Sequence, residues 1–160
     1  MVIKSLIVII GILFFLSLEY LFPKEKIEFK DKLSRIFKNI FFWLVNIGIT
    51  PIIILPITIY ATQFELHGLF KFENIIFNFL FQLIIIDIFL YWWHRLNHQL
   101  PFLWRFHHVH HLDETLDISS GVRFHFGEVI LSALIRSIII ITFNISLINL
   151  LLIEAIILLS

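Results

Sequence analysis

The sequence predicts an all-α integral membrane protein with about four to five transmembrane or re-entrant helices and a histidine-rich cap on the cytoplasmic side. Composition is the first observation: 59% of the 160 residues are hydrophobic, only 15% are charged, and the mean hydropathy is +0.96, unlike soluble domains. Several apolar stretches also reach the roughly 20 residues that cross a bilayer as a helix. Finally, seven of the eight histidines lie between positions 94 and 125.

The chain is expected to form one membrane domain over residues 1–160. Its four membrane segments are predicted at residues 1–22, 40–60, 74–93 and 129–160. No small-residue cleavage site follows the first segment, which is therefore predicted to be a retained helix. Pro51 and Pro56 interrupt the second segment and predict a kink. The last segment is too long for one simple span, so we expect two helices that meet near residues 144–146.

The distribution of Lys and Arg predicts the orientation of these segments. Most basic residues lie in a loop at residues 23–39 and in the histidine-box region at residues 94–127, whereas the opposite side has only Lys4 and Lys71. Because cytoplasmic loops carry the excess of Lys and Arg, both regions are expected in the cytoplasm and the amino terminus outside.

Charge and cysteine content exclude several classes of function. Twelve basic residues balance twelve acidic ones, which disfavours a nucleic-acid partner. The sequence has no cysteine, so it can supply neither a thiolate nucleophile nor a thiolate metal ligand.

The histidines form two groups with helical spacing. His94 and His98 are four residues apart. In the second group, His110 and His111 lie three and four residues after His107. Residues three or four apart project from the same side of a helix. Each group therefore points its imidazoles to one side, and two such groups can converge on metal.

An acidic residue and two more histidines are candidate members of this site. Asp87 shares one helical stripe with His94 and His98, but lies two turns from His94, which favours an outer-shell role over direct ligation. His108 projects about 100° away from His107 on a helix. His108 and His125 are candidates for additional metal ligands or outer-shell partners.

The residue types leave the metal open but favour a pair of ions. A membrane zinc protease of the HExxH type would carry Glu after the first histidine, where this chain has Arg95. Zinc takes three or four protein ligands, so five clustered histidines suggest two ions, and imidazole suits iron, zinc and copper. A di-iron centre could activate dioxygen to attack an unactivated C–H bond of a membrane lipid.

At these residues the chain resembles the fatty acid hydroxylase and sterol desaturase superfamily of membrane non-haem di-iron oxygenases. The resemblance covers roughly residues 80–130 and rests on both histidine boxes with their flanking residues: Asp87, Tyr91, His94, Arg95 and His98, then Trp104, Arg105, Phe106, His107, His110 and His111, with a less specific segment at Arg123, His125 and Glu128.

The resemblance implies O₂-dependent hydroxylation or desaturation of a lipid, such as a sterol or fatty acid, at two irons in a cytoplasmic cap. It implies that the iron ligands are His94, His98, His107, His110 and His111. Electrons would come from a separate donor protein. The family carries a third HxxHH box further along its sequence, and residues 1–160 contain none after His111. We therefore expect this chain to be the amino-terminal part of a longer protein or a truncated relative.

Two alternatives to a lipid oxygenase remain open at this point. The histidines could serve a membrane metal-binding or transport protein, although a transporter would place ionisable residues along a path near the bilayer midplane. The chain could also be a catalytically incomplete scaffold with the same fold.

Overall fold

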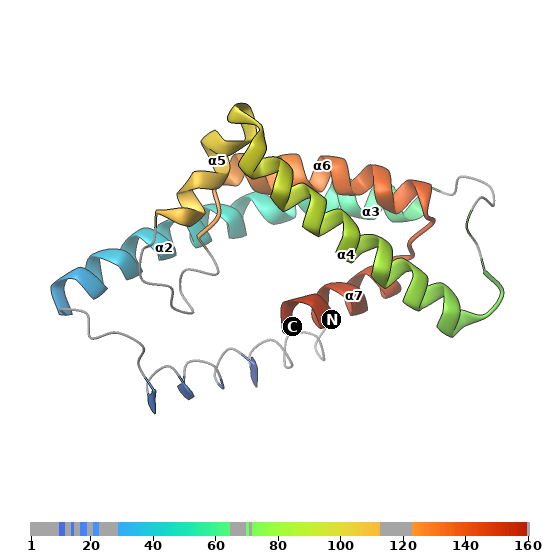
Figure 1. Cartoon of the computed structure of the whole chain (residues 1–160), viewed down its shortest axis with the longest axis horizontal. Coiled ribbons are helices and arrows are strands. Elements are labelled where there is room, and N and C mark those ends of the chain that lie inside the picture. Colours follow the sequence, from blue (N-terminus) through green and yellow to red (C-terminus); the bar gives the residue numbers. More distant parts are fainter. Residues whose placement is uncertain are drawn as a thin grey trace.

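The computed structural model describes residues 29–64, 70, 72–112 and 123–159, with a few positions between 10 and 22. In this part of the chain every regular element is a helix and there is no strand, which confirms the all-α prediction. The elements are α2 (Phe29–Ile49), the π-helix η1 (Thr50–Ile54), α3 (Leu55–Gln63), α4 (Ile75–Gln99), α5 (Pro101–His111), α6 (Phe126–Thr142) and α7 (Leu147–Leu159) (Figure 1).

The first long helix passes through both prolines without ending. Proline at position 51 has no N–H to donate and crowds the preceding turn. At this point the helix widens into the π-helix η1, in which the Leu55 N–H donates to the Thr50 carbonyl. The Thr50 hydroxyl donates to the Asn46 carbonyl at 2.7 Å. The predicted interruption is therefore a local π turn, and helix continues from α2 into α3.

Helix α4 extends six residues past the predicted end of its membrane segment at residue 93, as far as Gln99. Asn74 caps its amino-terminal end, where the Asn74 side chain accepts from the Phe77 N–H at 3.0 Å. It ends only where Pro101 forces Leu100 into an extended conformation, with ψ of 117°. The same proline starts α5. The first histidine pair thus belongs to the long apolar helix.

The last predicted membrane segment is indeed two helices, joined at residues 143–146. Asn144 adopts a positive φ of 49° in this turn, which Asn tolerates better than most residues. The side-chain amide of Gln82 on α4 donates to the carbonyls of Phe143 and Asn144, and Asn149 donates to the Gln82 carbonyl oxygen at 2.8 Å. These bonds satisfy the turn backbone inside an apolar environment.

The helices pack around a small core and leave much apolar surface outside. Helix α3 lies along α6, and α4 contacts α5 and α7 (Figure 1). Buried residues at the centre include Ala61, Ile86 and Ile153, while Ile75 on α4 is 83% exposed. Among the described residues, two helices are long and apolar enough to cross a membrane, at Leu33–Gln63 and Ile75–Gln99.

The structure changes two further predicted boundaries. Residues 29–39 of the predicted basic loop are helical and begin α2, since Lys, Arg and Leu are good helix formers. Helix α6 begins at Phe126, capped by His125, three residues before the predicted membrane segment at 129–160. The predicted membrane segment at residues 1–22 and the remaining part of the basic loop, residues 23–28, lie largely outside the described residues, as do residues 113–122.

Candidate metal centre

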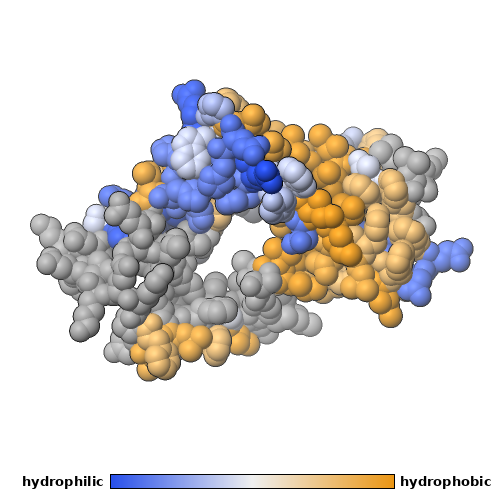
Figure 2. Space-filling view, in the orientation of Figure 1, coloured by the Kyte–Doolittle hydropathy of each residue, from blue (hydrophilic) through white to orange (hydrophobic). Residues whose placement is uncertain are grey.

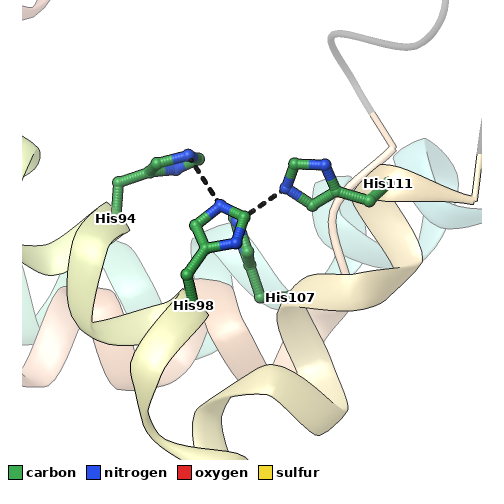
Figure 3. Close-up of side chains that lie close together, drawn as sticks. All are labelled: His94, His98, His107 and His111. Atoms are coloured by element: carbon green, nitrogen blue, oxygen red, sulfur yellow. Dashed lines mark hydrogen bonds between the residues drawn. The ribbon is translucent and has the colours of Figure 1, made fainter.

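Four imidazoles from two helices converge at the carboxyl-terminal end of α4. His94 and His98 come from α4, and His107 and His111 from α5 (Figure 3). One ring nitrogen from each lies within 4.8 Å of the ligating nitrogens of the other three. Within the described residues this is the group of side chains that could hold a metal ion.

Within each pair, the separation of the ring nitrogens matches that of two ligands on one ion. The Nε2 atoms of His94 and His98 are 3.2 Å apart, and those of His107 and His111 are 3.1 Å apart. Two nitrogens about 2.1 Å from a metal, at angles between 90° and tetrahedral, lie roughly 3.0–3.4 Å from each other. Each pair therefore has the nitrogen separation of two ligands on one ion, and the four nitrogens together lie within 4.8 Å of one another.

Helical spacing and one tight corner produce this convergence. Each pair is four residues apart, so its rings lie on one side of its helix, one turn apart. The Leu100–Pro101 corner then directs α5 back across the end of α4. The ring centroids of His94 and His98 consequently lie 4.6 and 4.8 Å from that of His107.

Glu128, on α6, holds the buried histidine of the cluster. The Nδ1 atom of His107 lies 2.8 Å from Glu128 Oε1, and the His107 side chain is fully buried. Asn97, also buried, donates to the same carboxylate oxygen at 3.4 Å. An Nδ1–H donated to the carboxylate leaves the Nε2 lone pair of His107 directed into the cluster, which is the arrangement of metal-binding histidines.

Burial sets the protonation states of these groups. Burial, together with the charges of His98 and His110, lowers the pKa of His107 to about 4. Burial likewise lowers the pKa of His111 and raises that of the Glu128 carboxyl. His107 and His111 are thus neutral at pH 7, the form that can bind a metal.

The fifth predicted ligand lies beside the cluster rather than in it. The His110 ring stacks on Phe124 at a centroid distance of 4.8 Å and is 6.0 Å from the His107 ring. Its Nδ1 and the second carboxylate oxygen of Glu128 are buried without a hydrogen-bond partner among the described residues. Both are unused ligand atoms next to the four-histidine group.

The two additional histidine candidates have other contacts. The Nδ1 of His108 lies 3.0 Å from the Arg105 carbonyl, to which it can donate. The Nδ1 of His125 accepts from the Gly127 N–H at 3.0 Å and so caps α6. Neither belongs to the four-histidine group.

Asp87, the predicted outer-shell acid, is exposed on α4, and no hydrogen bond or ion pair joins it to another described residue. The Tyr91 hydroxyl, one turn further along the same helix, accepts from Arg95 at 3.1 Å. An outer-shell role for Asp87 stays a prediction.

The carboxylate that does contact an imidazole is that of Glu128. In the sequence, Glu128 belongs only to the less specific segment of the resemblance. The sequence feature that could have identified Glu128 is its position as the acidic residue in the first turn of an apolar helix.

Two hollows flank this end of α4. One, of about 560 Å³, is lined by both α4 histidines with Tyr91, Arg95 and Gln99. The other, of about 530 Å³, is wholly apolar and lies between α4, α5 and α6, with Trp92 and Leu103 among its lining residues. In Figure 2 polar residues gather around α5, and apolar ones cover much of the other described helices.

Comparison with known families agrees with this site. The fatty acid hydroxylase profile matches residues 79–160, which include α4 from its second turn onward, both histidine pairs and Glu128. Comparisons with curated proteins and with solved structures gave no significant match. Because the profile covers half of the chain and contains the whole four-histidine group, the protein belongs to the fatty acid hydroxylase family.

Proposed function

We propose that this protein takes part in the O₂-dependent hydroxylation or desaturation of a membrane lipid at a histidine-ligated iron centre. The observation that carries the proposal is the convergence of four imidazole nitrogens within 4.8 Å at the end of an apolar helix. Family membership supports an oxidoreductase acting on lipids.

The contacts of each residue indicate its role in the proposed reaction. His94, His98, His107 and His111 would hold iron, with His110 adjoining a second iron. When bound, iron supplies the dioxygen activation that amino-acid side chains lack. Glu128 orients the His107 ring and keeps its Nε2 free of a proton, since the Nδ1–H is donated to the carboxylate.

The surroundings fit a lipid substrate. The hollow beside His94 and His98 opens at the end of a helix that can cross a membrane, where the aromatic residues Tyr91 and Trp92 are more than half exposed. Such side chains favour the headgroup region. We place the histidine boxes on the cytoplasmic side of a multi-pass protein, from the distribution of Lys and Arg, and assign electron supply to a separate donor protein.

A membrane metal transporter is the weaker alternative. Transport sites lie along a path between helices near the bilayer midplane. Here the histidines gather at one end of α4, and the polar residues further along it, such as Gln82, bind the turn between α6 and α7. The described structure therefore favours the enzyme.

Metal analysis of purified variants tests the proposal. The protein should retain iron after purification, and His107→Ala should remove most of it, since His107 contacts three other imidazoles and Glu128. His108→Ala, on the same helix but outside the cluster, is the matched control and should keep the metal. Zinc alone, or no metal in folded protein, would overturn the iron assignment.

A further inference from the structure

Arg95 is a cation in the hollow that contains two of the cluster histidines. Its side chain lines that hollow with His94 and His98. No acidic residue lines the hollow, and no carboxylate pairs with Arg95 among the described residues. A guanidinium at the edge of a membrane gains from an anionic partner, because the surroundings screen charge less than water does.

Two aromatic neighbours hold this guanidinium in place. Arg95 donates to the Tyr91 hydroxyl at 3.1 Å. Its Cζ also lies 5.2 Å from the centre of the Trp92 ring, a cation–π contact. The bond to Tyr91 uses one of five N–H donors, so the others remain for a ligand, and the fixed position reduces the entropy lost on binding.

We propose that Arg95 binds the oxyanion at the polar end of an amphiphilic lipid substrate. Guanidinium suits a carboxylate or a phosphate, which it can bind through two parallel hydrogen bonds. The inference rests on the proposed function, because the reaction site is the same hollow. The carbons nearest the histidines would then be those next to the anionic group, so oxidation is expected close to the polar end and not at mid-chain.

Binding can be measured without turnover in nanodiscs of phosphatidylcholine. The probe is 2-bromohexadecanoate, whose bromine quenches the fluorescence of nearby tryptophans, Trp92 among them, at a pH where the carboxyl is ionised. We expect saturable quenching that hexadecanoate or hexadecyl phosphate reverses and hexadecanol reverses at least 10-fold less well. The stronger of the two anionic competitors identifies the preferred headgroup. Equal competition by acid and alcohol would overturn the proposal.

Variants locate the effect. Arg95→Gln should weaken binding of the acid by about 10- to 100-fold, the loss of a charge-assisted pair, and Arg95→Lys should restore part of it. Arg105→Gln is the matched control, since Arg105 is exposed on the adjacent helix and does not line the hollow. Unchanged binding in Arg95→Gln overturns the inference alone. If the protein binds the acid through Arg95 but holds zinc alone or no metal, the proposed function is overturned and the inference about Arg95 is not.

Discussion

At the residue scale, the pairing of His107 with Glu128 is the contact that fixes the orientation of a buried imidazole in the four-histidine group. The imidazole is fully buried and its Nδ1 lies 2.8 Å from the carboxylate. In a buried ring without such a partner, rotation would turn Nε2 away from the cluster, and the other tautomer would carry its proton on Nε2 and leave no lone pair there.

Replacing this carboxylate should weaken metal binding without abolishing it. Glu128→Gln keeps a hydrogen-bond acceptor but removes the negative charge that makes His107 more basic, so metal affinity should fall by about 10- to 100-fold. Competition with a chelator measures the change. Asp87→Asn is the control, because the exposed Asp87 has no hydrogen bond to an imidazole among the described residues. Equal losses of metal affinity in the two variants would contradict the role given to Glu128 and support the outer-shell role predicted for Asp87.

At the scale of the helices, the site depends on how closely α6 approaches α5. Gly127 stands between Glu128 and the helix cap His125, against the ring of Phe106. A Cβ atom at position 127 would lie 2.8 and 2.9 Å from two carbons of that ring. Only a residue without a side chain permits this approach, and the approach brings Glu128 within reach of His107.

Gly127→Ala should therefore disturb both stability and the site. Overpacking of this kind costs about 1–3 kcal/mol, and the displaced helix should also lower metal affinity. Gly48→Ala is the matched control: a Cβ there meets nothing within 4 Å, and alanine favours a helix interior by up to about 1 kcal/mol. Thermal unfolding in detergent measures both. A Gly127→Ala protein as stable as the wild type would disprove the tight contact.

At the scale of the whole molecule, polar and titratable groups gather at one end of an otherwise apolar structure (Figure 2). Burial lowers the pKa values of His107, His111 and His125 from the ordinary 6.5. The unfolded chain therefore takes up protons before the folded chain as the pH falls, and protonation favours unfolding.

Without metal, the free energy of unfolding should fall as the pH decreases from about 6.5 to about 4, the pKa of His107. Thermal midpoints measured in the presence of a chelator report this loss. Glu128 acts in the opposite direction, since its raised pKa gives the folded state the extra proton above pH 4.5. The decrease should consequently be steeper in Glu128→Gln. A midpoint that rises on acidification would contradict the assigned pKa directions.

The amino-acid sequence by itself determined the helical class, the pair of helices after residue 129 and the histidines of the candidate metal centre. Hydropathy and helical spacing are local properties of the chain, so both can be interpreted without knowledge of the fold. Four of the five predicted ligands come together, because i, i+4 spacing already fixes each pair on its helix.

Only the tertiary structure decided which acid contacts the four-histidine group and which histidines lie outside it. Asp87 shares a helical stripe with His94, yet Glu128, 21 residues beyond His107, provides the contact. His110 stacks on Phe124, and His125 caps a helix instead of facing the cluster. These outcomes depend on the corner at Pro101 and on the close approach at Gly127, where chain segments distant in sequence meet and spacing along one helix carries no information.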